Sequence, residues 1–416
     1  MIHLGVIADD FTGATDVATA LRERGLRVIV ALGADAVPPP AEAEDLELDA
    51  VVVAVKTRTI AADRAVEMSL EALRHLTPLG PRQIYVKYCS TFDSTKDGNI
   101  GPVLDAVLTE LGASRTIVAP AFPANGRTVY RGHLFVGDEL LAESPMRDHP
   151  LTPMTESRVA AILRPQTRHS VGEVSIGEVS RGADALRAAL EAADSTYIVV
   201  DTTTEADLAT VSAAVADWPV ISGSAGLAYG VSGPHDPSSA EFPVPAGRRL
   251  VLCGSASATT RAQISSARDA GATMIKLDID RLLADPLDVV RSVTGLLADL
   301  PPDSLPVVHS VGRPDDVRDN AGGRGPAEHI ERVVAAIAST AVESLGFRQV
   351  IVAGGETSGA VATALGCRRL LIGPQIAPGV CWSVSATSEH TDVLLALKSG
   401  NFGGDDMFTT AWEALA

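Results

Sequence analysis

The chain begins with a pattern that recurs along its length, in the residues His3-Leu-Gly-Val-Ile-Ala-Asp-Asp-Phe-Thr-Gly-Ala-Thr15. Its apolar run predicts a buried strand, and the acidic pair Asp9 and Asp10 follows that run directly. The residues from Phe11 through Leu21 carry a helical pattern of apolar side chains. The stretch therefore predicts a strand, a loop and a helix in direct succession.

The same alternation recurs through the first half of the chain. Segments that predict buried strands lie at 27–32, 50–55, 83–86, 116–119, 198–201 and 220–223, and helical patterns lie at 64–76, at 103–111 and after 205. Wholly apolar strands that alternate with helices are typical of parallel α/β sheets. The stretch 120–152 is irregular and rich in Gly and Pro, and we expect it to form loops over a cleft.

A second α/β series follows a segment at 232–247 that carries four prolines and predicts a linker. Its strands are expected at 249–253, 273–277, 305–310 and 349–353, with a long helix at 327–345. We therefore predict an α/β fold with two tandem domains and mainly parallel sheets. Residues 1–231 form the first domain and 248–416 the second, with an active-site cleft between them.

The composition is that of a globular protein with a full core. Of 416 residues, 46% are hydrophobic, and 34 Lys and Arg against 52 Asp and Glu give a net charge of −18. Such a surface repels nucleic acid and anionic lipid. The four cysteines form no C-x-x-C pair, and the N-terminus does not read as a signal peptide. We expect a cytoplasmic protein with neither nucleic acid nor a membrane as partner.

Three Gly- and Ser-rich turns in the second half are candidate phosphate sites. Strand-to-helix turns with glycines allow backbone amides to approach a phosphate closely. A capped turn without ligand is the alternative for each, and no Walker sequence is present. The residues that could converge on one di- or triphosphate are Ser255, Ser257, Gly355, Glu356, Thr357, Ser358 and Gly400.

The first half places charged and hydroxyl side chains after its predicted strands. Lysine and arginine suit a substrate carboxylate, and an aspartate suits a sugar hydroxyl as acceptor or base. Solvated loop charges and a helix-capping loop are the alternatives. The candidates are Asp9, Asp10, Lys56, Arg58, Lys87, Ser90, Asp93 and Ser94.

Four segments together resemble the four-carbon acid sugar kinase family, over nearly the whole chain. They are Ile7-Ala-Asp-Asp-Phe-Thr-Gly-Ala14, Asp93-Ser-Thr with Gly98-Asn-Ile-Gly101, Ser222-Gly-Ser-Ala-Gly-Leu-Ala228 and Gly354-Gly-Glu-Thr-Ser-Gly359. The resemblance implies an acid-sugar-binding N-terminal domain and an ATP-binding C-terminal domain. It also implies ATP contacts at Ser257, Gly355 through Ser358 and Gly400.

Within that family, the segments 87–94, 121–129 and 396–403 are similar to the branch that phosphorylates 3-oxo-tetronate at C4. Threonate and erythronate kinases tend to carry an arginine shortly before the Gly-Asn-Ile-Gly turn, where this chain has Lys96 and Asp97. D-Threonate or D-erythronate 4-kinase activity is therefore the alternative within the family. An acid-sugar dehydrogenase or isomerase and a non-catalytic two-lobed binding protein are alternatives of another class.

The expected reaction is in-line transfer of the ATP γ-phosphoryl group to the C4 hydroxyl of the acid sugar. We expect Mg²⁺ to bridge the phosphates. Asp93 is the first candidate for orienting or deprotonating the hydroxyl, and Asp10 is the second. Asp9, Lys56, Arg58, Lys87, Ser90 and Ser94 would bind the substrate. The metal ligands and the oligomeric state are left open, a homodimer being one alternative.

Overall fold

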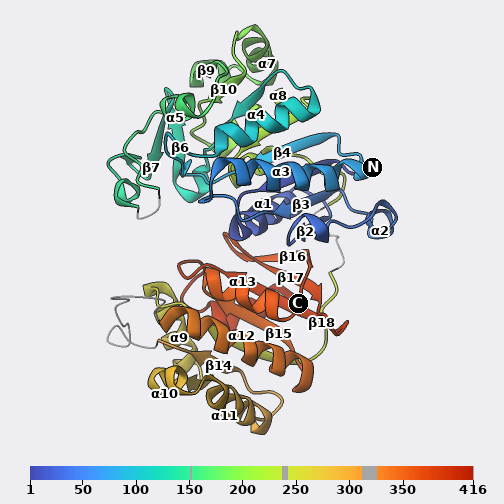
Figure 1. The fold of residues 1–416 in the computed structure, drawn as a ribbon, viewed down its shortest axis with the longest axis vertical. Helices are drawn as coiled ribbons and strands as arrows, with labels where there is room; N and C mark the ends of the chain where they lie inside the picture. The colour runs from blue at the N-terminus through green and yellow to red at the C-terminus, as the bar shows by residue number, and fades with distance from the viewer. Residues whose placement is uncertain (150–151, 237–241, 312–325, 416) are drawn as a thin grey trace. The chain divides into compact units, whose positions relative to one another are not determined.

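The computed structural model describes residues 1–149, 152–236, 242–311 and 326–415. Two compact units divide the chain, Met1–Ala240 and Glu241–Ala416 (Figure 1). The predicted linker 232–247 includes residues 237–241, which lie outside the described part of the chain. Each unit is an α/β structure with a mostly parallel sheet, so the predicted fold class is confirmed.

The first unit is built on five parallel strands in the order β11-β4-β1-β3-β2. Helix α1 packs against β2 and β3, and α3 packs against β1 and α4. Apolar residues of β1, β3 and β4 form one buried core with α3 and α4. The elements are β1 (Leu4–Ala8), α1 (Phe11–Glu23), β2 (Val28–Ala31), α2 (Pro40–Asp45), β3 (Ala50–Ala54), α3 (Ala62–Leu76), β4 (Gln83–Lys87), α4 (Ile100–Leu111) and β11 (Val220–Gly223).

The middle of this unit adds two small sheets. One is parallel, with strand order β5-β10-β9, and the other is antiparallel, with strand order β6-β7-β8. The prediction of loops over 120–152 is therefore wrong in part, because β6 to β8 form a meander there whose strands are only two to four residues long. The elements are β5 (Thr116–Val118), β6 (Arg127–Tyr130), β7 (His133–Val136), β8 (Glu139–Leu140), α5 (Val159–Leu163), β9 (Val171–Val174), α6 (Ile176–Val179), α7 (Ala183–Ala192), β10 (Tyr197–Val200) and α8 (Glu205–Ala214).

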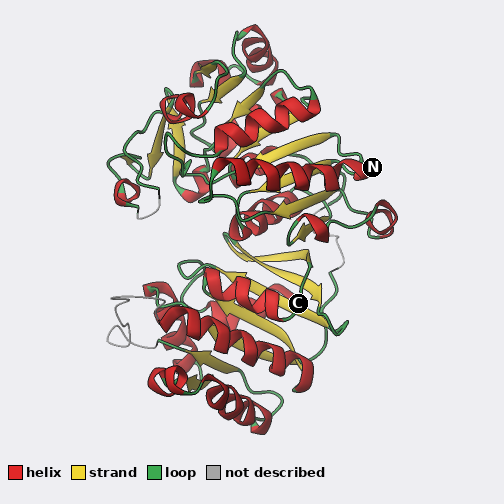
Figure 2. Ribbon diagram, in the orientation of Figure 1, coloured by secondary structure: helices red, strands yellow, loops and turns green. Residues whose placement is uncertain are grey.

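The second unit has a seven-stranded run in the order β16-β17-β18-β15-β12-β14-β13. Strands β18 to β13 are parallel, and β16 and β17 extend the run antiparallel. Figure 2 shows its helices and strands in red and yellow. The elements are β12 (Arg248–Cys253), α9 (Ala258–Asp269), β13 (Thr273–Lys276), α10 (Ile279–Ala284), α11 (Pro286–Asp299), β14 (Pro306–His309), α12 (Pro326–Ser344), β15 (Phe347–Ala353), α13 (Gly355–Ala364), β16 (Arg369–Ala377), β17 (Val380–Ala386), β18 (Asp392–Lys398) and α14 (Met407–Thr410).

In the second unit, every second side chain of β12, β15 and β18 points into one buried cluster. Val251, Ile351 and Leu394 belong to one buried cluster with Ile264 of α9 and Phe408 of α14. Helices α12 and α13 pack against each other and both contact β15. The side chains of β12, β15 and β18 that share this cluster therefore face α9.

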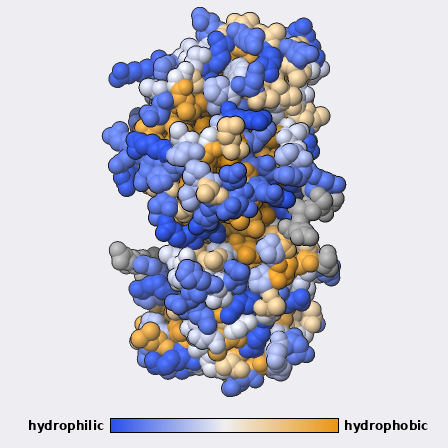
Figure 3. All heavy atoms as spheres, turned by 90° about the vertical axis from the view of Figure 1, so that its right-hand side faces the viewer, coloured by the Kyte–Doolittle hydropathy of each residue, from blue (hydrophilic) through white to orange (hydrophobic). Residues whose placement is uncertain are grey.

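The molecular surface is predominantly hydrophilic on the face that Figure 3 draws, where apolar side chains form separate patches. Within the described residues, no helix combines the length and the apolar character that crossing a membrane requires.

Candidate active site

The carboxyl edge of the first sheet brings together residues from three strand ends. Strand β1 lies between β3 and β4, with Ala8 paired to Ala54 on one side and to Lys87 on the other. The loops after these strands therefore start side by side. Asp9 follows β1, Arg58 follows β3, and Lys87 ends β4. The backbone of Asp9 is fixed there, since its amide donates to the Lys87 carbonyl at 3.1 Å.

Arg58 is held by two carboxylates. Its Nε and Nη2 donate to the two oxygens of Asp9 at 2.7 and 2.9 Å, and Nη2 also lies 2.8 Å from Asp10 Oδ1. Burial opposes ionisation of Asp9, but the charges of Arg58 and Lys87 outweigh it and lower the pKa of Asp9. Arg58 is thus already engaged in a bidentate fork of the type that strengthens ion pairs.

Lys87 is the buried cation of this cluster, with 4% of its side chain exposed. Its Nζ lies 3.6 Å from Asp9 and 3.5 Å from Asp10. Burial alone would lower the pKa of Lys87, but the charges of Asp10 and Asp9 raise it. Gly13 makes the site feasible, because a Cβ at this position would overlap Lys87 Nζ. Asp10 also caps α1, accepting from the Gly13 amide at 2.8 Å.

Asp16 of α1 belongs to the same electrostatic cluster, and the sequence reasoning missed it. Burial raises the pKa of Asp16 to about 7, although the nearby charge of Lys87 acts in the opposite direction. Its Oδ1 is buried and has no hydrogen-bond partner among the described residues. In the sequence Asp16 is only an acid within a mostly apolar helical segment, and nothing there distinguishes it from an acid on the exposed face of a helix.

The loop after β4 presents Asp93 without an ion-pair partner among the described residues. Thr91 Oγ1 donates to Asp93 Oδ1 at 2.6 Å. Phe92 between them is fully buried and has a φ of 51°, a left-handed conformation that is unusual for a bulky residue. The loop is therefore held in a specific shape. Asp93 caps no helix, since α4 begins after Asn99, so the capping alternative does not apply to it.

A small pocket joins Asp93 to the charged cluster. The residues lining it come from β1, α3, β4, the start of α4 and the segments that follow β1, β3 and β4. They include Asp9, Thr57, Arg58, Ser69, Lys87, Tyr88, Asp93 and Asn99. Asn99 fixes one wall by donating to the carbonyls of Thr57 and Ile60 at 2.6 and 3.0 Å. Thr57 and Asn99 were not among the predicted site residues, because their roles depend on contacts between distant segments.

The other predicted residues of the first unit lie around this pocket and do not line it. Lys56 is exposed and makes no ion pair with the described residues. Ser90 is partly exposed, and Ser94 is buried against Gly98, where a Cβ would overlap the Ser94 hydroxyl. The structure thus brings Asp9, Arg58, Lys87 and Asp93 into one pocket, with Asp10 paired to two of them.

The serines of the Ser222-Gly-Ser segment hydrogen-bond to neighbouring strands and loops of the first unit. Ser222 Oγ donates to the Ile117 carbonyl at 2.7 Å and lies 3.2 Å from the Tyr88 hydroxyl. Ser224 Oγ donates to the Ala121 carbonyl at 2.8 Å. These contacts join β11 to β5 and to the segment that follows β4, so they support the strand end at which Lys87 lies.

The carboxyl edge of the second sheet brings the three Gly- and Ser-rich turns together. Strand β15 pairs in parallel with β12 and with β18, and Ala353 lies opposite both Cys253 and Lys398. The turns packed there leave little room for added atoms. A Cβ at Gly400 would overlap the Ser255 hydroxyl, and one at Gly354 would lie 2.8 Å from Thr357 Oγ1.

Ser257 closes the first of these turns. Its hydroxyl accepts from the Thr260 amide at 3.1 Å as the N-cap of α9, and it donates to the Gly400 carbonyl at 2.6 Å. Ser255 Oγ accepts from the Ser257 amide at 3.2 Å. Both hydroxyls therefore hydrogen-bond to the protein itself, as expected for a capped turn that binds no ligand through its side chains.

The turn after β15 is open in comparison. Gly354 stands at the N-cap of α13 and provides no side-chain cap. The first amides of a helix have no intrahelical acceptor and attract anions. Gly355 and Glu356 are exposed, and a Cβ at Gly355 would meet nothing within 4 Å. Thr357 and Ser358 are buried, so their backbone is better placed for a ligand than their hydroxyls are.

Lys398, the last residue of β18, was quoted in the sequence pattern but not assigned a role. It is 1% exposed, and its Nζ donates to the Gly400 carbonyl at 3.2 Å. Burial lowers the pKa of Lys398 to about 8, with Cys253 acting weakly in the opposite direction. In the sequence alone, nothing distinguishes this lysine from one on a solvent-exposed strand end.

Metal ligands do not cluster in the described residues, which contain no group of three or more His, Cys, Asp or Glu that could hold a metal ion. The Mg²⁺ expected from the sequence thus has no protein cage in this part of the chain.

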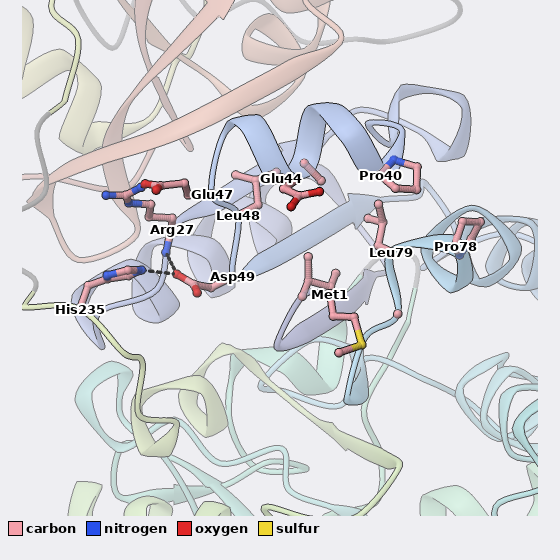
Figure 4. A pocket seen from close by; sticks show the side chains of 13 residues that line it. Met1, Arg27, Pro40, Glu44, Glu47, Leu48, Asp49, Pro78, Leu79 and His235 are labelled. Carbon is pink, nitrogen blue, oxygen red and sulfur yellow. Dashed lines mark hydrogen bonds and ion pairs between the residues drawn. The ribbon is translucent and has the colours of Figure 1, made fainter.

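A second cavity, of about 540 Å³, lies at the opposite edge of the first sheet (Figure 4). Its lining residues precede the strands: Arg27 precedes β2, and Asp49 precedes β3. Asp49 accepts from the Arg27 amide at 2.8 Å and pairs with His235 at 3.0 Å. Ligands of open α/β sheets bind at the carboxyl ends of strands, so this larger cavity is not the candidate active site.

Family comparisons match the two units separately. The family described as "Sugar-binding N-terminal domain" matches residues 4–231, and the one described as "Nucleotide-binding C-terminal domain" matches residues 250–408. The first match contains the pocket with Asp93, and the second contains all three Gly- and Ser-rich turns.

Full-length relatives agree with these matches. A 3-oxo-tetronate kinase of Burkholderia multivorans is 43% identical over 99% of this chain and 97% of its own, and one of Pectobacterium atrosepticum is 42% identical over 100% of both chains. A solved Salmonella typhimurium protein superposes with a TM-score of 0.91 at 38% identity, covering 99% of both chains. A solved Haemophilus influenzae protein has a TM-score of 0.84 at 38% identity, covering 98% of this chain and 99% of its own. The chain therefore belongs to the four-carbon acid sugar kinase family.

Proposed function

We propose that this protein is an ATP-dependent kinase that phosphorylates the C4 hydroxyl of 3-oxo-tetronate. The observation that carries the proposal is the near full-length similarity, at 39–43% identity, to several proteins named 3-oxo-tetronate kinase. The sugar-binding and nucleotide-binding matches support it, since each covers one of the two carboxyl edges. The dehydrogenase, isomerase and binding-protein alternatives have no comparable support.

In the first unit, the sugar acid would bind at the pocket of Asp9, Arg58, Lys87 and Asp93. Arg58 and Lys87 supply positive charge for the substrate carboxylate, although both already face Asp9 and Asp10. A carboxylate ligand would therefore share these cations with the acids, while sugar hydroxyls can donate to the acids. Lys56, Ser90 and Ser94 would act at the margin of the pocket.

Asp93 is our candidate for orienting the C4 hydroxyl and accepting its proton. A general base needs an available oxygen within hydrogen-bond reach of the hydroxyl. Asp93 meets this requirement better than Asp10 does, because it has one hydroxyl donor, Thr91, whereas Asp10 faces Arg58, Lys87 and the α1 amide of Gly13. Asp10 remains the second candidate.

In the second unit, we assign nucleotide phosphates to the start of α13 and the adjoining turns. The exposed Gly355 allows close approach, and the uncapped amides can donate to phosphate oxygens. Ser255, Ser257 and Gly400 shape this edge, and Glu356 lies at its exposed rim. Mg²⁺ would neutralise phosphate charge when bound with the nucleotide.

Transfer requires the hydroxyl and the γ-phosphorus to meet in line. The interdomain active-site cleft, the cytoplasmic location and the homodimer stay predictions.

A screen of ADP release over four-carbon acid sugars tests the proposed activity. The candidates are 3-oxo-tetronate, D-threonate and D-erythronate, each with ATP and Mg²⁺. We expect the highest kcat/KM for 3-oxo-tetronate. Faster turnover of either reduced acid would move the assignment to that alternative, and no ADP release with any of them would refute it.

The position of the phosphate can be read directly from the product. The substrate carries a secondary hydroxyl at C2 and a primary hydroxyl at C4. Phosphorus at C4 couples to two methylene protons, whereas phosphorus at C2 couples to one proton. We expect a triplet in the proton-coupled ³¹P spectrum, and a doublet would show that the C2 hydroxyl is the acceptor.

A further inference from the structure

Lys398 is a buried cation that no acid balances. Its side chain is 1% exposed, and no carboxylate among the described residues forms an ion pair with its Nζ. Placing a charge in a protein interior is costly unless an opposite charge or several hydrogen bonds compensate for it. The protein supplies neither in full, since an ammonium has three donors and Lys398 has one acceptor.

That single acceptor is shared. The Gly400 carbonyl also accepts from Ser257 Oγ at 2.6 Å and from Thr260 Oγ1 at 2.9 Å, whereas Lys398 Nζ lies 3.2 Å away. A carbonyl oxygen has two lone pairs, so three donors exceed its capacity, and the longest of the three contacts belongs to the lysine.

The surroundings of Lys398 are also unfavourable for a cation. Ser257 and Thr260 begin α9, and the Gly354 amide, which donates to the Lys398 carbonyl at 2.9 Å, precedes α13. Helix N-termini carry partial positive charge. Two helix starts and an ammonium group thus meet at one strand edge, an arrangement that favours an anion.

We propose that Lys398 neutralises the phosphate charge of the bound nucleotide. The proposal rests on the proposed function, because it takes the ligand of this edge to be a nucleotide phosphate. The sequence pattern assigned this site only to glycine, glutamate and hydroxyl residues. The proposal adds Lys398 to them. The phosphate would supply the negative charge that no described acid provides. Its oxygens would accept hydrogen bonds from the ammonium donors that Gly400 does not engage.

A measurable consequence is the uptake of a proton. The free protein holds the pKa of Lys398 at about 8, because burial penalises its charged form. A phosphate beside it would raise that pKa, so the lysine takes a proton from solvent when the ligand binds. With half of the lysines neutral at pH 8, uptake should be about 0.5 proton per ligand at that pH and close to none at pH 6.5.

The other groups near Lys398 do not titrate in this range. Cys253, on β12, is the titratable neighbour that acts on it, and burial raises the pKa of this thiol to about 12. Ser257 and Thr260 of α9 and Gly400 carry no charge. The ligand's own terminal phosphate is fully ionised at pH 8, since such groups titrate near pH 6.

Titration calorimetry with ADP at pH 8, in HEPES and in Tris buffer, measures affinity and proton uptake together. We expect Lys398→Met to abolish the uptake and weaken ADP binding by roughly 10- to 100-fold, the range for a charge-assisted contact. The melting temperature should not fall, because the variant removes an unpaired buried charge. Lys276→Met, at an exposed lysine on β13 of the same unit, is the matched control and should behave as the wild type.

The outcomes separate the inference from the proposed function. Wild-type affinity and uptake in a folded Lys398→Met protein would overturn the inference while leaving nucleotide binding intact. No ADP binding by the wild type would overturn the proposed function itself. Should Lys398→Met not fold, Lys398→Gln, which keeps a polar end without the charge, carries the same expectations.

Discussion

Two lysines at equivalent places have opposite electrostatic surroundings. Lys87 ends β4 in the first unit, and Lys398 ends β18 in the second; both are almost fully buried at the carboxyl edge of a parallel sheet. Lys87 faces Asp9 and Asp10, whose charges raise its pKa. Lys398 has no acid partner among the described residues, and burial lowers its pKa to about 8.

This difference indicates a division of labour between the two edges. At the first edge Asp9 and Asp10 already balance the charges of Arg58 and Lys87, which suits a ligand that brings two hydroxyls and only one negative charge. The second edge keeps its positive charge uncompensated, which suits a ligand with several negative charges. Burial is similar in the two places, so the presence or absence of acids, and not depth, decides the behaviour of each lysine.

The largest effect is expected at Asp93, a carboxylate of the first edge that forms no ion pair with the described residues. Asp93→Asn keeps the size and removes the charge. Loss of general-base assistance should lower kcat by roughly 10²- to 10⁴-fold, with ADP affinity unchanged and stability altered by less than about 1 kcal/mol. Steady-state kinetics and thermal melts measure these quantities.

The control for that variant is Asp97→Asn, an exposed aspartate in the same loop, which should keep normal turnover. A near-normal kcat in Asp93→Asn would transfer the role of base to Asp10.

Lys87→Met should lower the free energy of unfolding, whereas Lys398→Met should not. Removing the cation leaves Asp9 and Asp10 with Arg58 as their shared partner, and breaking a buried pair costs about 3 kcal/mol. Because the cost requires an ionised Asp9, whose pKa lies below its ordinary 3.8 beside Arg58 and Lys87, it should be full at pH 7 and diminish only below about pH 4. Urea unfolding at pH 7 and at about pH 3 measures it.

Lys56→Met is the matched control, since Lys56 is exposed and should change stability by less than about 0.5 kcal/mol. Equal destabilisation by Lys87→Met and Lys398→Met would remove the distinction between the two edges.

Gly355→Val tests whether the open start of α13 serves the ligand. The protein itself has room there, so the melting temperature should stay unchanged. A β-branched side chain would crowd the phosphates and weaken ADP binding by roughly 10- to 100-fold. Gly295→Val, at a helical glycine of the same unit with equally open surroundings, is the control and should bind ADP normally. Unchanged affinity in folded Gly355→Val would move the phosphates elsewhere.

The smallest effect is expected at Asp16, a further acid beside Asp9 and Asp10, whose charges Arg58 and Lys87 already balance. Its pKa is about 7 in the fold against 3.8 ordinarily, so the fold loses stability as the pH rises between these values. Asp16→Asn should therefore stabilise the protein by about 1 to 3 kcal/mol at pH 8 and by less at pH 5. The same gain at both pH values would show that its carboxyl does not titrate in this range.

The sequence predicted the elements whose pattern is local and missed what depends on distant contacts. Apolar strands followed by polar turns predicted β1, β4, β12 and β15, and the charged or glycine residues after them. The strands of β6 to β8 were missed because they are short and lie in a Gly- and Pro-rich stretch. Burial of Lys398 and Asp16 could not be predicted, since neighbouring strands and helices create it.

If the sugar acid binds at the first edge and the nucleotide at the second, each edge lysine should affect one ligand only. Titration of ADP and 3-oxo-tetronate separately into folded Lys87→Met and Lys398→Met proteins measures this. We expect a crossed result, in which Lys87→Met loses affinity for the sugar acid and keeps that for ADP, and Lys398→Met does the reverse. Loss of affinity for both ligands in either variant, or for the same ligand in both variants, would show that the two ligands do not bind at separate edges.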